Sequence, residues 1–227
     1  MKRMSLAVVG LLLLLFLASG AWAQRIEWEI KVHKEPSQLK DEVTQMINQD
    51  YVPLGMCLKD QDMYLLYVKG APITMSAWSI NKYQDLEKLK TGVTDMMNGG
   101  YVPTGLTYTG TEYFILFIKS PNTAEAWRLI FPDNTSEAVT KAIGEFTQQN
   151  YFPVGISAHD QKYYVLLIKT KTTSVKRWRI DAYKDEQSEL VAGINKKIEE
   201  GFIPWGFDYR GETVQILYLG FESSDEK

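Results

Sequence analysis

The sequence is poor in the residues that form disulfides, bind metals and contact nucleic acids. Its 227 residues include one cysteine, Cys57, and two histidines, His33 and His159. A single cysteine excludes an internal disulfide framework, and these three scattered residues match no metal-ligand spacing. With 25 basic and 28 acidic residues, the chain lacks the excess of Lys and Arg that general nucleic-acid binding requires. We therefore expect no nucleic-acid partner and no cofactor.

Motifs of several enzyme classes are also missing. The chain contains no G-x-S-x-G elbow, no glycine-rich phosphate loop and no H-E-x-x-H helix. His159 lies beside Asp160 in an expected hairpin turn and His33 follows an expected strand, so both are interpreted as solvated residues. Cys57 lies between two apolar residues of an expected strand and is interpreted as a buried, unreactive side chain. We therefore expect a protein that is not an enzyme.

The N-terminus has the pattern of a secretory signal peptide. Basic residues precede an apolar stretch from Leu6 to Leu17, and Ala21-Trp22-Ala23 fits an A-x-A cleavage site. The apolar stretch is shorter than the roughly 20 residues of a membrane span. We predict cleavage before Gln24, with export to the periplasm or the extracellular space and no stable membrane insertion. Removing residues 1–23, which carry two basic residues and no acidic one, changes the net charge from -3 to -5.

A five-residue motif, aromatic-x-Pro-x-Gly, occurs four times. Its copies are residues 51–55, 101–105, 151–155 and 202–206, at intervals of 50, 50 and 51. A tryptophan lies upstream of each copy, at Trp28, Trp78, Trp127 and Trp178. This periodicity predicts four tandem repeat units after the signal peptide at 1–23. The units are 24–74, 75–123, 124–174 and 175–221, followed by an acidic tail at 222–227.

Each unit is expected to fold as strand, helix, strand and strand. The tryptophan segments alternate polar and apolar residues, which is typical of a strand with one wet face. Apolar residues at spacings of three and four then predict an amphipathic helix. After the motif, a second strand and a polar turn lead to a third strand without polar alternation, which we expect to be covered on both faces. The third strands are Met63–Lys69, Tyr113–Lys119, Tyr163–Lys169 and Val214–Gly220.

Capping residues mark the expected helix ends. Ser37 and Ser136 are expected N-caps, because a hydroxyl group accepts a hydrogen bond from the first turn of a helix. Gly100 and Gly201 stand where glycine commonly ends a helix.

The connections predict an α+β fold class. A right-handed crossover through the helix makes the first two strands parallel, and a hairpin makes the third strand antiparallel to the second. The apolar third strand is expected to lie between the other two. Four tandem β-α-β-β units of about 50 residues then carry mostly antiparallel sheet with helices on one face, a split arrangement like half of a ferredoxin-like domain. Single units bury too little surface to be stable alone, and two docked pairs or one closed four-unit assembly both agree with the sequence.

The motif itself has a structural and a functional interpretation. Proline lacks a backbone N–H and suits an edge strand, whereas glycine permits an unusual backbone angle or the close approach of a neighbour. Because all four units carry the motif, a shared folding role is favoured over four equivalent ligand sites.

Two features are less well explained by folding. Tyrosines that begin or nearly begin the third strands would form an aromatic surface on any sheet face left open by the helices. A basic linker also concentrates positive charge in an acidic protein, although a solvated loop explains it as well. We predict that the partner-binding residues, for a protein or glycan partner, are Tyr64, Tyr113, Tyr163, Lys171, Lys176 and Arg177.

These observations favour an exported, non-enzymatic tandem-repeat protein that acts as a binding or assembly module. The alternative is an enzyme or a small-ligand carrier with a site at a cleft between units. An enzyme requires one unit to carry titratable residues that its sister units lack, and no unit does so convincingly. The sequence contains no indication of the oligomeric state.

Overall fold

A computed structural model describes residues 25–35, 37–170 and 175–221. Unit 1 comprises β1 (Glu27–His33), α2 (Leu39–Ile47), β2 (Tyr51–Lys59) and β3 (Asp62–Lys69). Unit 2 comprises β4 (Ala77–Tyr83), α3 (Leu86–Asn98), β5 (Tyr101–Tyr108) and β6 (Tyr113–Lys119). Unit 3 comprises β7 (Ala124–Ile130), α4 (Ser136–Thr147), β8 (Phe152–His159) and β9 (Lys162–Thr170). Unit 4 comprises β10 (Val175–Lys184), α5 (Gln187–Glu199), β11 (Ile203–Arg210) and β12 (Thr213–Phe221). The predicted signal peptide and acidic tail lie outside the described residues.

Each unit forms a separate three-stranded antiparallel sheet with its third strand in the centre. The strand orders are β1-β3-β2, β4-β6-β5, β7-β9-β8 and β10-β12-β11. Both outer strands are antiparallel to the central one, so they run parallel to each other as the crossover predicts. The α+β class and the repeated architecture are therefore confirmed, while the likeness to half of a ferredoxin-like domain stays a prediction.

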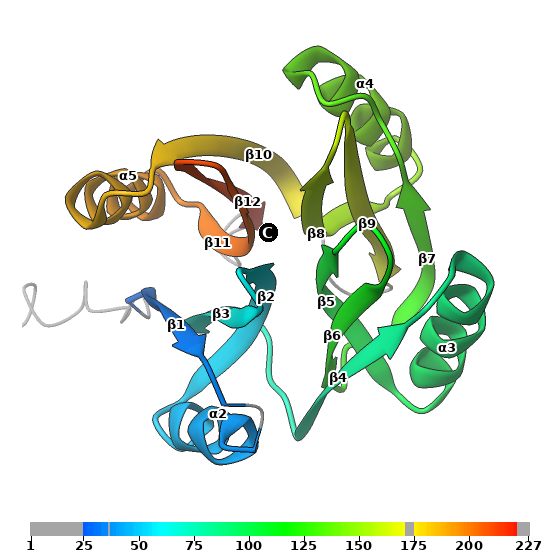
Figure 1. The fold of residues 1–227 in the computed structure, drawn as a ribbon, viewed down its shortest axis with the longest axis horizontal. Helices are drawn as coiled ribbons and strands as arrows, with labels where there is room; N and C mark the ends of the chain where they lie inside the picture. Colours follow the sequence, from blue (N-terminus) through cyan, green and yellow to red (C-terminus); the bar gives the residue numbers. More distant parts are fainter. Residues whose placement is uncertain (1–24, 36, 171–174, 222–227) are drawn as a thin grey trace, which may run out of the picture.

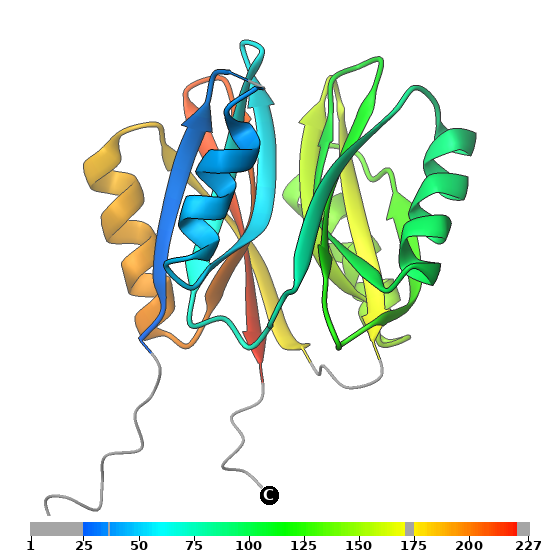
Figure 2. The ribbon, with the colours of Figure 1, turned by 90° about the horizontal axis from the view of Figure 1, so that it is seen from below.

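The four units form a closed ring. Figure 1 shows the second strand of each unit near the centre and the helices on the outside. Around this centre β2 contacts β5, β5 contacts β8, β8 contacts β11, and β11 contacts β2 again. Figure 2 shows the ring from the side, with the strands running roughly along its axis. The sequence left two arrangements open, and the structure has the closed four-unit assembly rather than two docked pairs.

Both faces of each sheet are covered, by different parts of the molecule. In unit 1, Leu65 and Tyr67 pack with Val43 of α2, whereas Leu66 and Val68 join the central core shared by the units. The helices lie on one face, as expected, but the opposite face is not open to solvent, because the neighbouring unit packs against it. This double coverage explains why the third strands lack polar alternation.

Each first strand connects its unit to the helix of the preceding unit. Trp127 of unit 3 donates from Nε1 to Thr94 Oγ1 on α3 of unit 2, at 3.4 Å. Trp28 of unit 1 donates from Nε1 to Asn195 Oδ1 on α5 of unit 4, at 2.9 Å, and so closes the ring. The other two tryptophans pack against clusters that contain the preceding helix: Trp78 with Val43 and Met46 of α2, and Trp178 with Val139 and Ile143 of α4. The repeated tryptophan is therefore a contact between units.

The aromatic-x-Pro-x-Gly motif forms a β-bulge in every second strand. The pairing register shifts between proline and glycine in all four units, so the residue between them is an extra residue on the strand. These bulged residues are at most 3% exposed: Leu54, Thr104, Val154 and Trp205. Each second strand is also an edge strand of its own sheet, where proline is tolerated.

The motif glycines allow the second strands to approach each other closely. A Cβ atom added to Gly155 would lie 2.7 Å from the backbone nitrogen of Leu106 in unit 2, and one added to Gly55 would lie 2.9 Å from the Cα of Gly206. Such separations are far below van der Waals contact, so only glycine fits at these two positions. This geometry agrees with the folding interpretation of the motif.

The helix caps differ slightly from expectation. Thr135, not Ser136, is the N-cap of α4, and its side chain accepts from the Ala138 N–H; Gln38, not Ser37, is the N-cap of α2. The two N-cap predictions are therefore wrong by one residue. Gly100 and Gly201 follow their helices with φ of +83° and +82°, as expected of C-terminal glycines.

The glycine contacts predict opposite effects for two alanine substitutions. Gly155→Ala forces a Cβ into the backbone of β5 and should lower the free energy of unfolding by about 1–3 kcal/mol. Gly144→Ala is the control, since no atom lies within 4 Å of its added Cβ and alanine favours a helix by about 1 kcal/mol over glycine. Urea unfolding measures both. Equal stability of the two variants would contradict the close approach of the second strands.

The tryptophan contacts predict a moderate loss on truncation. Trp127 is only half-buried, so Trp127→Ala should cost about 2–3 kcal/mol, below the roughly 3–5 kcal/mol of a fully buried ring. Trp127→Phe keeps the apolar contact with α3 and should cost less than about 1.5 kcal/mol. Chemical denaturation of both variants checks this order. A loss below about 0.5 kcal/mol for the alanine variant would show that the contact between units contributes little.

Candidate functional site

The predicted tyrosine surface is largely buried between units. Tyr113 is 9% and Tyr163 is 6% exposed, and both lie in the hydrophobic clusters of the ring. Tyr163 donates its hydroxyl to Gln215 Oε1 of unit 4. Tyr64 is half-buried, with its ring 5.0 Å from that of Tyr209. Packing between units accounts for these rings, and their role in partner binding stays a prediction.

Two of the three predicted basic residues, Lys176 and Arg177, are described by the structure. Lys171 falls outside the described residues, while Lys176 and Arg177 are exposed at the start of β10. The Arg177 guanidinium lies 4.5 Å from the centroid of the Phe202 ring and donates to the Glu200 carbonyl at 3.3 Å. Arg177 therefore has a local structural partner, and its binding role also stays a prediction.

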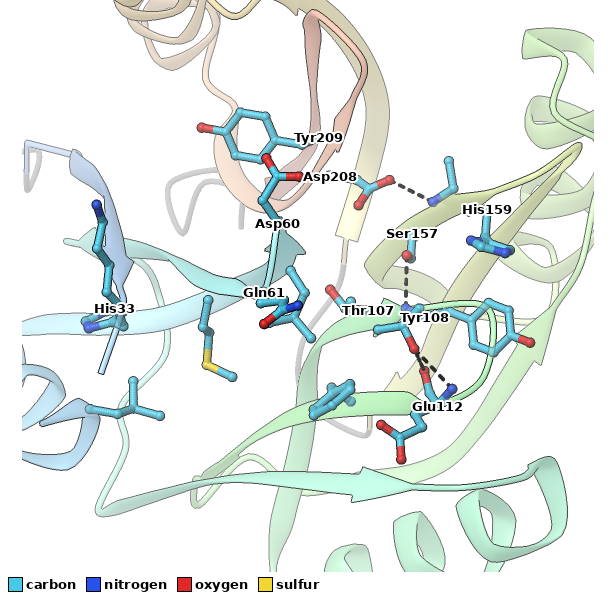
Figure 3. A pocket seen from close by; sticks show the side chains of 17 residues that line it. His33, Asp60, Gln61, Thr107, Tyr108, Glu112, Ser157, His159, Asp208 and Tyr209 are labelled. Atoms are coloured by element: carbon cyan, nitrogen blue, oxygen red, sulfur yellow. Dashed lines mark hydrogen bonds between the residues drawn. The ribbon is translucent and has the colours of Figure 1, made fainter. Parts of the chain in front are cut away.

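A deep cleft opens at the end of the ring where the β-hairpin turns meet. This axial cleft has a volume of about 750 Å³ and is lined by residues from all four units. Figure 3 shows the side chains that line it and labels ten of them, from His33 of unit 1 to Tyr209 of unit 4. Unit 1 contributes His33, Lys34, Leu39, Leu58, Asp60, Gln61 and Met63; unit 2 contributes Thr107, Tyr108, Thr109, Glu112 and Phe114; unit 3 contributes Ser157, Ala158 and His159; unit 4 contributes Asp208 and Tyr209.

Four equivalent polar side chains lie at or beside the inner end of this cleft. Cys57, Thr107, Ser157 and Asp208 each stand two residues after a motif glycine, and each is at most 4% exposed. We call them the polar quartet. Thr107, Ser157 and Asp208 line the cleft directly, and Cys57 contacts one of these three, because its Sγ donates to Asp208 Oδ1 at 3.2 Å.

The polar quartet binds each second strand to the one before it. Every member hydrogen-bonds with the backbone of the preceding unit, and Cys57 does so with unit 4 across the closure of the ring. The bonds are Thr107 Oγ1 to Met56 O (3.2 Å), Tyr108 N to Ser157 Oγ (3.0 Å), Ala158 N to Asp208 Oδ2 (2.7 Å) and Tyr209 N to Cys57 Sγ (3.4 Å). Small polar residues at this position therefore satisfy buried backbone groups that no sheet ladder reaches.

Burial changes the acid–base chemistry of two members of the quartet. Burial raises the pKa of Asp208 to about 7, although its hydrogen bonds with the Ala158 N–H and the Cys57 thiol oppose the shift. Burial and the nearby Asp208 carboxyl raise the pKa of the Cys57 thiol far above its ordinary value. Because the thiolate is the reactive form of cysteine, Cys57 is held in its unreactive state. The interpretation of Cys57 as a buried, inert residue agrees with this environment.

The rim of the cleft carries charged and aromatic groups from the hairpins. Asp60 and Gln61 form the turn of unit 1, with φ of +53° and +73°. Glu112 of unit 2 accepts from Lys82 Nζ at 3.2 Å. His159 packs edge-on against the Tyr108 ring, with centroids 5.4 Å apart, and its side chain is 36% exposed. His159 is therefore a partly solvated hairpin residue, as the sequence indicated, but one at the edge of a cleft.

The other histidine corrects a prediction. His33 is 4% exposed, so its interpretation as a solvated residue is wrong. Its Nδ1 lies 2.5 Å from Glu42 Oε2 of α2, and its Nε2 lies 3.0 Å from the Tyr67 hydroxyl. Units 2 and 4 place Tyr83 and Tyr183 at the equivalent position, above helix glycines at the position of Glu42. Unit 1 thus pairs a small imidazole with a carboxylate, where units 2 and 4 place a large tyrosine ring over a glycine. The burial of His33 becomes apparent only when the strand position and the facing helix position are compared together.

Among residues 25–35, 37–170 and 175–221, no three His, Cys, Asp or Glu side chains are grouped as metal ligands. Helices long and apolar enough to span a membrane are likewise not found in that part of the chain.

Comparison of the sequence with protein families and curated proteins identifies no relative. No protein-family model matches the sequence, and a search of curated proteins finds no match. The residues of the axial cleft are thus the basis for assigning a function.

The environment of Asp208 predicts a pH-dependent contribution to stability. Its pKa is higher in the folded chain, about 7, than the ordinary 3.8, so its contribution is fully present below about pH 4 and is lost as the pH rises through 7. The free energy of unfolding of the natural protein, minus that of Asp208→Asn, should therefore fall between pH 4 and 8 by up to about 4 kcal/mol. Urea unfolding at several pH values measures this difference. Asp41→Asn, which removes an exposed carboxylate on α2, is the matched control for loss of a carboxylate. A flat profile for Asp208→Asn would show that its carboxyl is ionised throughout.

Proposed function

We propose that this chain is an exported, non-enzymatic binding protein that holds a small molecule in the axial cleft. The observation that carries the proposal is the cleft itself, which has a volume of about 750 Å³ and is built from all four units. Ligand sites in proteins typically have roughly 300–1,000 Å³ and are apolar with a few placed polar groups. Export rests on the signal-peptide pattern of residues 1–23.

The lining of the cleft supports a specific occupant. Equivalent positions of the four units pack in the same way, and the aromatic, proline and glycine of the motif accordingly recur in every unit. The residues three positions after the motif glycine vary instead: they are Leu58, Ala158 and two tyrosines, Tyr108 and Tyr209, and all four line the cleft. A single asymmetric ligand on the ring axis meets each unit differently, so these differences agree with one site per molecule.

The turn at the rim gives further support. Two-residue turns in the left-handed region favour Asn-Gly or Asp-Gly, whereas this turn has Asp60 followed by Gln61 at φ of +73°. Holding a non-glycine residue there costs of order 1 kcal/mol or more, and such strain is concentrated at binding sites. Gln61 brings to the cleft an amide group that a glycine would lack.

An enzyme at the same cleft is the alternative, because a carboxyl group with a pKa near 7 is typical of general acid–base catalysts. Two observations favour binding. The Cys57 thiol is protonated, and both oxygens of Asp208 already accept hydrogen bonds from the chain itself. A protein or glycan contact through Lys176 and Arg177 is a separate prediction that does not depend on the cleft.

Equilibrium dialysis tests the proposal and separates it from the alternative. The mature chain is dialysed against a metabolite extract of its source cells, and both compartments are compared by untargeted mass spectrometry. A binding protein enriches one or a few compounds unchanged, whereas an enzyme consumes some compounds and forms others. Enrichment should be lost in Ala158→Phe, which fills the cleft from its wall, and in Leu58→Trp, provided that circular dichroism shows a folded ring. No enrichment, or enrichment that both folded variants retain, would overturn the proposal.

A further inference from the structure

We infer that the ligand of the axial cleft is an organic ammonium compound, with its cationic end toward Asp60 and Asp208 and an apolar body against the opposite wall. This inference rests on the proposed function and names the chemical class of the ligand. It stands on the distribution of charged, aromatic and aliphatic groups around one cavity.

The described lining carries more negative than positive groups. Asp60, Glu112 and Asp208 line the cleft, and Lys34 is the one Lys or Arg among the described lining residues. In the view of Figure 3 the carboxyl groups of Asp60 and Asp208 lie toward one end of the cleft and Glu112 toward the other. Lys82 pairs with Glu112, and both oxygens of Asp208 accept hydrogen bonds from the chain, so the exposed carboxylate of Asp60 is the principal direct partner for a cation and Asp208 adds negative charge behind it. A cation near Asp208 would also stabilise its ionised form and offset the effect of burial.

Hydrogen-bond acceptors are concentrated beside these carboxyl groups. Ser157 Oγ accepts from the Tyr108 N–H and, as a hydroxyl, has a second acceptor site; Gln61 adds an amide oxygen at the rim. An ammonium group carries only donors, up to three of them, and therefore matches such a wall. An anion or a carboxylic acid would place like charges within the same cavity.

The remaining wall is apolar and aromatic. Leu39, Leu58, Met63 and Phe114 line the part of the cleft that units 1 and 2 share, and Tyr108 adds an aromatic ring. Apolar walls bury hydrocarbon, which favours an amine that carries an apolar body over a metal ion or a small inorganic cation. The volume of about 750 Å³ accommodates such a molecule.

Three isosteric probes test the ligand class. Titration calorimetry at pH 8, where Asp208 is ionised, compares 4-phenylbutylamine, 4-phenylbutanol and 4-phenylbutyrate on the mature chain. The amine should bind at least tenfold more tightly than the alcohol, and the carboxylate should bind most weakly. The variant Asp60→Asn should lose about five- to tenfold in amine affinity without changing the affinity for the alcohol. Asp133→Asn, which removes an exposed carboxylate paired with Lys162, should leave all three affinities unchanged.

The outcomes separate the ligand class from the site. Equal or tighter binding of the alcohol, or an unchanged amine affinity in Asp60→Asn, would overturn the ammonium inference while the cleft remains a binding site. Failure of all three probes, together with a dialysis result that identifies a neutral or anionic compound, would do the same. Failure of the probes and no enrichment in dialysis would overturn the proposed function as well. Loss of amine binding in the folded Ala158→Phe variant places the probe in the cleft, and retention of binding there would overturn the assignment to this site.

Discussion

The whole ring depends on the close approach of four backbone strands at its axis. The second strands meet where the motif glycines remove every side-chain atom, and the bulged residues beside them fill the centre of the ring. Backbone groups brought together in this way still require hydrogen-bond partners. The polar quartet supplies them, with one small polar side chain from each unit bonded to the strand before it. The close approach of the second strands therefore requires the polar side chains that lie beside it.

The same geometry positions the candidate site. Because the hairpins of all four units point to one end of the ring, their turns surround an opening at the axis, and the polar quartet lies at its inner end. A unit alone would have no such cleft. The tryptophan contacts on the preceding helices hold the units at the spacing that keeps the opening. The tryptophan contacts at the outside of the ring and the cleft at its axis are therefore connected through the same sheets.

The unit was predictable from the sequence because its elements depend on local patterns. Alternation, helical periodicity and the apolar third strand identify four β-α-β-β units and place the third strand in the centre. Ring closure was not predictable, since the contact of Gly55 with Gly206 joins units 1 and 4 and has no trace in periodicity. The tyrosines were chosen by density, but Tyr113 and Tyr163 face neighbouring units, which only the packing shows. The sequence did contain an indication of the site. The residues two and three positions after each motif glycine vary between units, and most of them line the cleft.

Ring closure also has a consequence for how the chain reaches its native state. Cys57 and Asp208 lie 151 residues apart, so the contacts between units 1 and 4 form only after nearly the whole chain has been made. Until then unit 1 exposes the apolar sheet face that unit 4 covers in the closed ring. Contacts of such long range form slowly, and unit 4 of a second chain presents the same surface at no extra enthalpic cost. Exchange of terminal units between chains is therefore the assembly error to which this architecture is most exposed, and dilution during folding favours the closed monomeric ring.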